Sequence, residues 1–520
     1  MDGGRVQIFV TMCIYMSVVI GIGIYYVKRA SQNSDNYLIG SRSIGPWITA
    51  MGAEASDMSG WLLMGLPGVA YWFGLSDAVW TAIGLLIGTY LNWLLVAKRL
   101  RSYSVISGDA ITIPDYFSNR FHEEKKILAT IAALFILIFF TVYASSCFVT
   151  VGKLFGTLFG VKYQTMMITG ALFVIFYTVI GGFLAESASD FMQGVVMFFS
   201  LVAVLLVGVS VAGGIGAVAD NVKQIPGFFD FFGIAQPVMA NGVQQMGESG
   251  KPLFGEAGSY GLLTIISTLS WGLGYFGMPQ VLLKFMAIRK TKELTLSRRV
   301  ATIWCAISLT AAVAIGIIGR ALYPDLFLTQ GASENIFIMM STNFFIPVIA
   351  GVVMAGILAA TISSSDSYLL IAASAFSKSL YQGIIKKDAS DKAVLYVTRL
   401  TLLVIAIFAM VIALDENSII FAIVSFAWAG FGAAFGPIML FSLFWKRVNR
   451  AGAIGGMLVG GGMVFIWKLL LKPLGGVFGI YELFPAFVVS CITIVIVSLL
   501  TKEPSLKIQK EFELAKTFEC

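Results

Sequence analysis

The stretch "GAEASDMSGWLLMGLPG", from Gly52 to Gly68, decides how this sequence folds. It lies inside a long apolar segment, yet it carries two acids, Glu54 and Asp57, together with two serines, four glycines and a proline. Glycine and proline interrupt helices, and carboxylates are costly at membrane depth. The stretch therefore predicts a membrane-spanning helix that is broken around a polar site.

The composition of the whole chain indicates a membrane protein. The 520 residues are 58% hydrophobic and only 12% charged, whereas ordinary globular chains are about 25% charged. Apolar runs of about twenty residues recur, and each is long enough to cross a hydrocarbon core of roughly 30 Å. No soluble stretch separates these runs, so we expect one all-α polytopic domain over residues 1–520.

The apolar runs define thirteen expected membrane spans. The first is too long and too weakly charged at its start for a cleaved signal peptide. The expected spans cover residues 6–27, 46–74, 76–97, 127–155, 163–184, 188–212, 257–283, 300–322, 344–376, 393–413, 417–445, 451–471 and 481–500.

A second interrupted span, "SWGLGYFGMP" at Ser270–Pro279, lies five spans after the first. Spans 2–6 and 7–11 then form two five-helix repeats, each beginning with a broken helix. An odd number of spans per repeat makes the two repeats inverted, which is typical of secondary transporters with a site near the membrane midplane. The expected parts are 1–45 (first span and inner loop), 46–212 (first repeat), 213–256 (outer loop, forming a short helix or a lid), 257–445 (second repeat), 446–500 (last two spans) and 501–520 (tail).

The distribution of Lys and Arg predicts the orientation of the spans. With the N-terminus outside and the C-terminus in the cytoplasm, 27 of the 35 basic residues fall in inner loops or the tail, with Lys284 counted among them. The net charge of +7 then reflects topology rather than nucleic-acid binding, because it is spread over separate short loops.

No catalytic, nucleotide-binding or metal-ligand motif appears, so we expect no enzyme.

The break in span 2 suits an ion site. Backbone carbonyls freed at membrane depth are ligands for a hard cation such as Na⁺, and the positive ends of half-helices suit a carboxylate. Asp57 is either an electrostatic part of this site or a cap on the second half-helix, bonding the N–H of Ser59 or Gly60. Glu54 either joins the site or sits closer to an aqueous funnel.

A second polar cluster, "AATISSSDS" at Ala359–Ser367, lies in span 9. Its hydroxyls either form an uncharged oxygen cage for a monovalent cation or bond back to their own helix. Asp366 in this cluster and Asp190 at the start of span 6 are each a second ion site, a proton site or a residue near the inner mouth. Four aromatic residues beside the breaks either wall a pocket or pack in the ordinary way, namely Trp61, Tyr143, Trp271 and Tyr275.

Five motifs carry a resemblance to a known family. They read "SDMSGWLLMGLPG", "TIPDYF", "FFTVYASS", "WGLGYFGMP" and "FAWAGFGAAFGPIMLFSLFWKR". In this order, from about Tyr37 to Trp467, the chain resembles the sodium:solute symporters. The resemblance implies Na⁺-coupled import of L-proline by alternating access, in a bacterial plasma membrane, with no obligatory protein partner. The alternatives are Na⁺- or H⁺-coupled symport of pantothenate, a short carboxylate, another amino acid or a sugar, and, outside this class, a channel or a membrane sensor.

The resemblance also implies roles for individual residues. Na⁺ would bind the carbonyls of Ala55, Met58 and Ala360 and the hydroxyls of Ser363 and Ser364. For coupling, the resemblance implies Asp57, Ser59, Gly60 and Arg42. For solute binding, it implies Trp61, Tyr143, Trp271, Tyr275 and Pro279. For a possible second ion site, it implies Asp190, Asp366 and Ser367. The family members that move proline have threonine at Ser364 and neutral residues at Glu54 and Asp366, which leaves the ion stoichiometry open.

Overall fold

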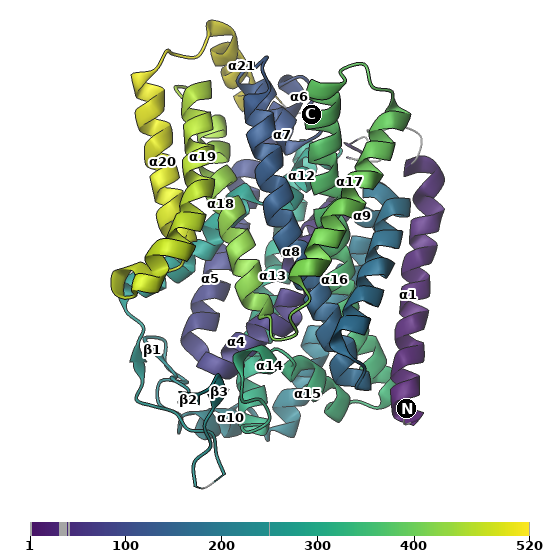
Figure 1. The fold of residues 1–520 in the computed structure, drawn as a ribbon, viewed down its shortest axis with the longest axis vertical. Helices are drawn as coiled ribbons and strands as arrows, with labels where there is room; N and C mark the ends of the chain where they lie inside the picture. The colour runs from purple at the N-terminus through teal and green to yellow at the C-terminus, as the bar shows by residue number, and fades with distance from the viewer. Residues whose placement is uncertain (1–2, 31–38, 40–41, 249, 519–520) are drawn as a thin grey trace.

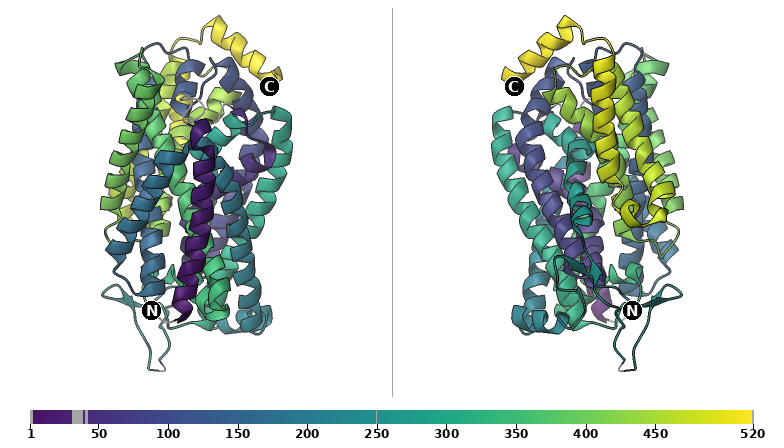
Figure 2. Two further views of the ribbon diagram at one scale, coloured as in Figure 1. Left: turned by 90° about the vertical axis from the view of Figure 1, so that its right-hand side faces the viewer. Right: turned by 90° about the vertical axis from the view of Figure 1, so that its left-hand side faces the viewer.

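The computed structural model describes residues 3–30, 39, 42–248 and 250–518, and it is a bundle of long helices (Figure 1). The N-terminus and the short strands β1–β4 lie at one end of the bundle, here called the N-terminal face. Helices α6, α7 and α21 lie at the opposite end, the C-terminal face (Figures 1 and 2). The predicted all-α fold is confirmed.

The first half of the chain contains expected spans 1 to 6. Its helices are α1 (Gly3–Ala30), α3 (Pro46–Gly60), the π-helical turn η2 (Trp61–Gly65), α4 (Leu66–Phe73), α5 (Leu75–Leu91), η3 (Asn92–Val96), α6 (Ala97–Ile106), α7 (Ile113–Arg120), α8 (Ile127–Phe159) and α9 (Tyr163–Val211). Helix α1 runs along the outside of the bundle (Figure 2) and packs on α9 and α16.

The second half contains expected spans 7 to 13 and the tail. Its helices are α11 (Leu262–Leu269), the 3₁₀ segment η4 (Ser270–Gly277), α12 (Pro279–Ala287), η5 (Thr291–Glu293), α13 (Leu294–Leu322), α14 (Gln330–Ser333), α15 (Ile336–Phe344), α16 (Pro347–Ser374), η6 (Ala375–Ile385), α17 (Asp391–Ile412), α18 (Ile420–Phe444), α19 (Arg450–Ile466), η7 (Trp467–Leu471), η8 (Lys472–Leu474), η9 (Gly476–Gly479), α20 (Leu483–Leu500) and α21 (Leu506–Thr517).

The connection between the two repeats forms the expected short helix, α10 (Ile215–Val222). It continues into two small antiparallel pairs at the N-terminal face (Figure 1). Strand β1 (Gly233–Ile234) pairs with β4 (Gly258–Ser259), and β2 (Met239–Ala240) pairs with β3 (Val243–Gln244). A lid function for this segment stays a prediction.

Ten helices within the described residues are long and apolar enough to cross a membrane. The three expected spans outside this set are the broken helices 46–74 and 257–283 and the shorter segment Tyr163–Val179. Span 2 contains the polar break, span 7 is divided into the three pieces α11, η4 and α12, and Tyr163–Val179 is short. A criterion of length and apolarity therefore passes over the two interrupted helices and the one short segment.

Helix α9 contains two spans and must turn between them. The hydroxyl of Tyr177 donates to the hydroxyl of Ser189 at 2.8 Å. Twelve residues of straight helix would separate their Cα atoms by about 18 Å, further than these two side chains reach. The prediction of two separate spans in this region is therefore correct.

Close backbone contact holds α5 against the broken segment η4. A Cβ atom at Gly88 would overlap the backbone of Gly272, and a Cβ at Gly272 would overlap the carbonyl of Gly84. Small residues allow such approach between membrane helices. We expect Gly88→Val to destabilise the protein by about 1–3 kcal/mol through overpacking. Thermal unfolding of the purified protein in detergent measures this.

Gly462 on α19 offers the matched control, because a Cβ atom there meets nothing within 4 Å. Gly462→Val is expected to change stability by only about 0.5 kcal/mol. Equal losses of stability in the two variants would contradict the close-contact explanation.

Candidate functional site

The predicted break in span 2 lies at Ser59, whose φ of 42° and ψ of −170° leave the helical region. Beyond it, the N–H of Trp61 donates to the carbonyls of Met58 and Ser59 and, at 3.2 Å, to the Ser59 hydroxyl. In an unbroken helix this N–H would bond the carbonyl of Asp57. That carbonyl instead accepts the hydroxyls of Tyr143 at 3.2 Å and Tyr368 at 3.4 Å. The break is thus satisfied by side chains from α8 and α16, as a buried break requires.

The serines of span 9 lie directly against this broken helix. The hydroxyl of Ser363 donates to the Ala55 carbonyl at 2.6 Å, and that of Ser364 donates to the same carbonyl at 3.3 Å. Met58 follows Ala55 by three residues, and Ala360 precedes Ser363 by three, so each lies on the same helix face as its partner. All five residues are buried. The structure therefore brings together the two segments that carry the predicted Na⁺ ligands.

The side chain of Asp57 connects the two broken helices. Its Oδ1 accepts a hydrogen bond from Nε2 of Gln280 at 3.1 Å, and Gln280 lies in the first turn of α12. Gln280 was missed in the sequence, because a lone glutamine gave no signal of its own. The other acid, Glu54, is buried and not in an aqueous funnel, and its Oε1 accepts the indole N–H of Trp93 at 3.4 Å.

The predicted aromatic residues fall into two groups. The Trp61 and Trp271 rings lie 5.6 Å apart, and both pack on Phe421. Tyr275 joins this group through Trp428, whose indole N–H donates to the Trp271 carbonyl at 2.8 Å. Tyr143 packs instead on Tyr368, with ring centroids 4.2 Å apart and the rings tilted by 31°. Pro279 begins α12, where its missing N–H suits the first helical position.

Arg42 lies at the C-terminal face, where it ties the first repeat to the end of α12. Its guanidinium donates to the Met286 carbonyl at 2.6 Å and the Ala110 carbonyl at 2.7 Å, and it pairs with Asp109 at 2.9 Å. Gln280 and Met286 are six residues apart on α12, or about 9 Å along the axis. Arg42 is therefore connected to the site through α12.

The residues predicted for a second ion lie in one buried cluster. Asp190 and Asp366 lie with Glu186, and one carboxylate oxygen from each of the three lies within 4.8 Å of the other two. The hydroxyl of Ser367 donates to Glu186. Glu186 was missed, although its spacing of four from Asp190 already placed both acids on one helix face.

Lys284 also belongs to this cluster, and its assignment to an inner loop was wrong. Its ammonium lies 3.0 Å from Glu186 and 2.9 Å from Asp190, and its side chain is 1% exposed. The α12 helix continues to Ala287 and buries this residue. The sequence pattern wrongly indicated a loop residue because Lys284 directly follows the last residue of the expected apolar span.

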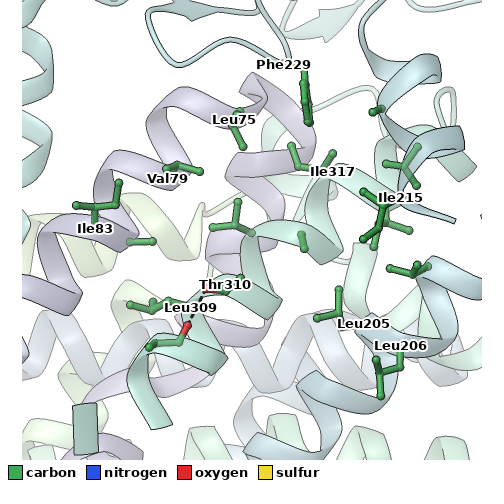
Figure 3. Close-up of a pocket in the computed structure, with 18 of the residues that line it drawn as sticks. Leu75, Val79, Ile83, Leu205, Leu206, Ile215, Phe229, Leu309, Thr310 and Ile317 are labelled. Carbon is green, nitrogen blue, oxygen red and sulfur yellow. Dashed lines mark hydrogen bonds between the residues drawn. The ribbon is translucent and has the colours of Figure 1, made fainter. Parts of the chain in front are cut away.

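Two cavities differ in character. A groove of about 660 Å³ between α5, α9, α10 and α13 is lined by apolar side chains such as Leu75, Ile215 and Ile317, and contains none of the site residues (Figure 3). Its apolar lining does not suit a polar solute. A vestibule of about 1270 Å³ opens at the N-terminal face and is lined by polar groups including Lys153 and Gln330.

Comparison with known proteins decides the family. The sequence profile of the sodium:solute symporter family matches residues 37–460. This chain belongs to the sodium:solute symporter family. A sodium/proline symporter of Staphylococcus aureus (strain USA300 / TCH1516) is 42% identical over 504 residues, which cover 96% of this chain and 93% of that protein. The sodium/proline symporter of strain JH9 matches to the same extent.

Solved structures show the same fold. A substrate-bound, outward-open Na⁺-coupled sialic acid symporter superimposes with a TM-score of 0.76 at 18% identity, covering 96% of this chain and 99% of that one. MhsT in complex with L-phenylalanine gives a TM-score of 0.54 at 12% identity, covering 87% of this chain and 97% of that one. This sodium:solute symporter is a multi-pass membrane protein that couples solute import to Na⁺.

Proposed function

We propose that this symporter imports L-proline together with Na⁺ by alternating access. The observation that carries the proposal is the contact of the Ser363 and Ser364 hydroxyls with the Ala55 carbonyl at the break in span 2. A relative named as a sodium/proline symporter, 42% identical over nearly the whole chain, supports proline as the solute.

The Na⁺ site is an uncharged oxygen cage. The carbonyls of Ala55, Met58 and Ala360 and the hydroxyls of Ser363 and Ser364 are hard ligands, which suit a small monovalent cation. When Na⁺ binds, it replaces the two hydrogen bonds to the Ala55 carbonyl. Both serine hydroxyls turn their hydrogens away, and their oxygens become ligands. The ion thereby joins α3 to α16 and fixes the shape of the broken helix. Asp57 lies next to this cage and supplies a negative charge.

The solute site lies beside the break, on the side of Trp61. The indole Nε1 of Trp61 is buried and has no hydrogen-bond partner within the described residues. Buried tryptophans usually have one, so this N–H is available to a polar group of a solute. The Trp61, Trp271 and Phe421 rings provide an apolar wall for the pyrrolidine ring. The N-terminal end of α12 favours a carboxylate.

A vestibule at one face and hydrogen bonds at the end of α12 at the other support the assignment of the N-terminal face to the outside. The vestibule opens at the N-terminal face, which the Lys and Arg pattern assigns to the outside. At the C-terminal face, the end of α12 is closed by Arg42 and by Arg101, which donates to the Ile288 carbonyl at 2.8 Å. Opening toward the cytoplasm requires these bonds to break. The C-terminus is then cytoplasmic.

Uptake of radiolabelled L-proline into proteoliposomes tests the proposal. We expect accumulation with an inward Na⁺ gradient and none with an equal K⁺ gradient, because the chain belongs to a family that couples transport to sodium. Counterflow exchange separates a carrier from a channel, since a channel gives none. Absence of proline uptake by folded protein would refute proline as the solute, and Na⁺-dependent thermal stabilisation would then identify the solute.

A further inference from the structure

The buried cluster beside the Na⁺ site already contains a cation. The ammonium of Lys284 donates to Glu186 Oε1 at 3.0 Å, to Asp190 Oδ2 at 2.9 Å and to the Ser187 hydroxyl at 3.0 Å. A lysine ammonium has three protons, so these bonds use all of them. All four side chains are buried.

The same residues would otherwise make a good site for a free cation. The carboxylates of Glu186, Asp190 and Asp366 converge within 4.8 Å. Such a set of hard oxygen donors, with a serine hydroxyl beside it, binds cations. Here the ammonium fills the space between two of the carboxylates. Asp366 takes its hydrogen bond from the N–H of Ser367 instead.

The cluster lies next to the proposed Na⁺ site and connects helices that also carry residues of that site or contact them. Ser367 follows Ser363 by one helical turn on α16, and its hydroxyl donates to Glu186 on α9. Lys284 lies on α12, one turn beyond Gln280, which contacts Asp57. The cluster therefore links α9, α12 and α16 in the way that an ion would link them.

We propose that Lys284 is a built-in counter-cation, which takes the position of a second transported ion and limits this symporter to one Na⁺ per solute. This rests on the proposed function and differs from the expectation of a second free ion at Asp190, Asp366 and Ser367. A tethered ammonium cannot leave to the cytoplasm, so it stabilises the carboxylates in every cycle without drawing on the Na⁺ gradient. Coupling then comes from the cage at Ala55 and Ser363 alone.

Equilibrium binding of radioactive Na⁺ to the purified protein, without solute, tests this directly. We expect about one Na⁺ per chain in the wild type and about two in the double variant Lys284→Met/Glu186→Gln, which removes the ammonium and leaves Asp190 and Asp366 open. The double change keeps the net charge of the cluster, and comparison with Glu186→Gln alone isolates the loss of the tethered cation. Because no solute is present, the count does not depend on whether proline is transported.

A second buried ion pair serves as the matched control. Lys153 and Glu334 lie 2.6 Å apart near the N-terminal face, and Lys153→Met/Glu334→Gln is expected to leave the count at about one. Two sites in the wild type, or a single site in the folded Lys284→Met/Glu186→Gln variant, would overturn the proposal. If that variant does not fold, the wild-type count decides, with Glu186→Gln expected to stay at about one because Lys284 is retained.

Discussion

Ser363→Ala is expected to raise the Na⁺ concentration for half-maximal uptake by about 10- to 100-fold. The change removes one of the two hydroxyls at the Ala55 carbonyl. Interactions with charged groups contribute about 1.5–3 kcal/mol, and 1.4 kcal/mol corresponds to a tenfold change in affinity. The measurement is the initial rate of proline uptake into proteoliposomes as a function of external Na⁺. Asp57→Asn is expected to act in the same direction, because it removes the charge beside the cage.

Ser365→Ala is the matched control for the Ser363 variant. Ser365 lies on the same helix and is equally buried, but its hydroxyl donates to the carbonyl of Thr361 in its own helix. We expect nearly unchanged Na⁺ activation in this variant. Normal Na⁺ dependence in both Ser363→Ala and Asp57→Asn would contradict the assignment of the ion site.

Lys153→Met is expected to destabilise the protein by about 3–5 kcal/mol, because it leaves a buried carboxylate without its counter-charge. Glu334 accepts the Lys153 ammonium at 2.6 Å and the backbone N–H groups of Ile420 and Phe421 at 3.0 and 2.9 Å. It therefore holds the start of α18 against α8. The lysine is needed to neutralise the carboxylate at this depth. The midpoint of thermal unfolding in detergent, compared with the wild type, measures the loss.

Two further variants show whether the unpaired charge is the cause. Lys153→Met/Glu334→Gln removes both charges and is expected to recover part of the lost stability, since no buried ion remains. Lys223→Met removes an exposed partner of Asp220, 4.0 Å away, and is expected to change stability by less than about 1 kcal/mol. An equal loss in the single and double variants would point to packing rather than charge.

The sequence was sufficient to predict the architecture, because each of its signals was local. Apolar runs give spans, and glycine with proline at Gly52–Gly68 and Ser270–Pro279 gives the two breaks. The exact residue of the first break was not predictable. The break lies at Ser59 although Gly60 is next to it, and part of the reason is tertiary: the Asp57 carbonyl that the break frees accepts the hydroxyls of Tyr143 and Tyr368.

Contacts between distant segments were the part that the sequence could not supply. Nothing near Gln280 in the chain indicates that its amide meets Asp57 across 223 residues. Lys284 was assigned to a loop because a lysine after an apolar run usually marks a membrane boundary. Its acidic partners lie on α9, almost a hundred residues earlier, so only the folded structure explains how its charge is buried.

The C-terminal helix α21 has a consequence for how the protein is made. It crosses the C-terminal face (Figure 2), where Glu511 pairs with His122 at 2.7 Å and the Phe518 carbonyl accepts the Ser102 hydroxyl at 2.8 Å. These two partners, Ser102 and His122, belong to the first quarter of the chain, which leaves the ribosome long before α21. This face therefore remains incomplete until α21 has been synthesised.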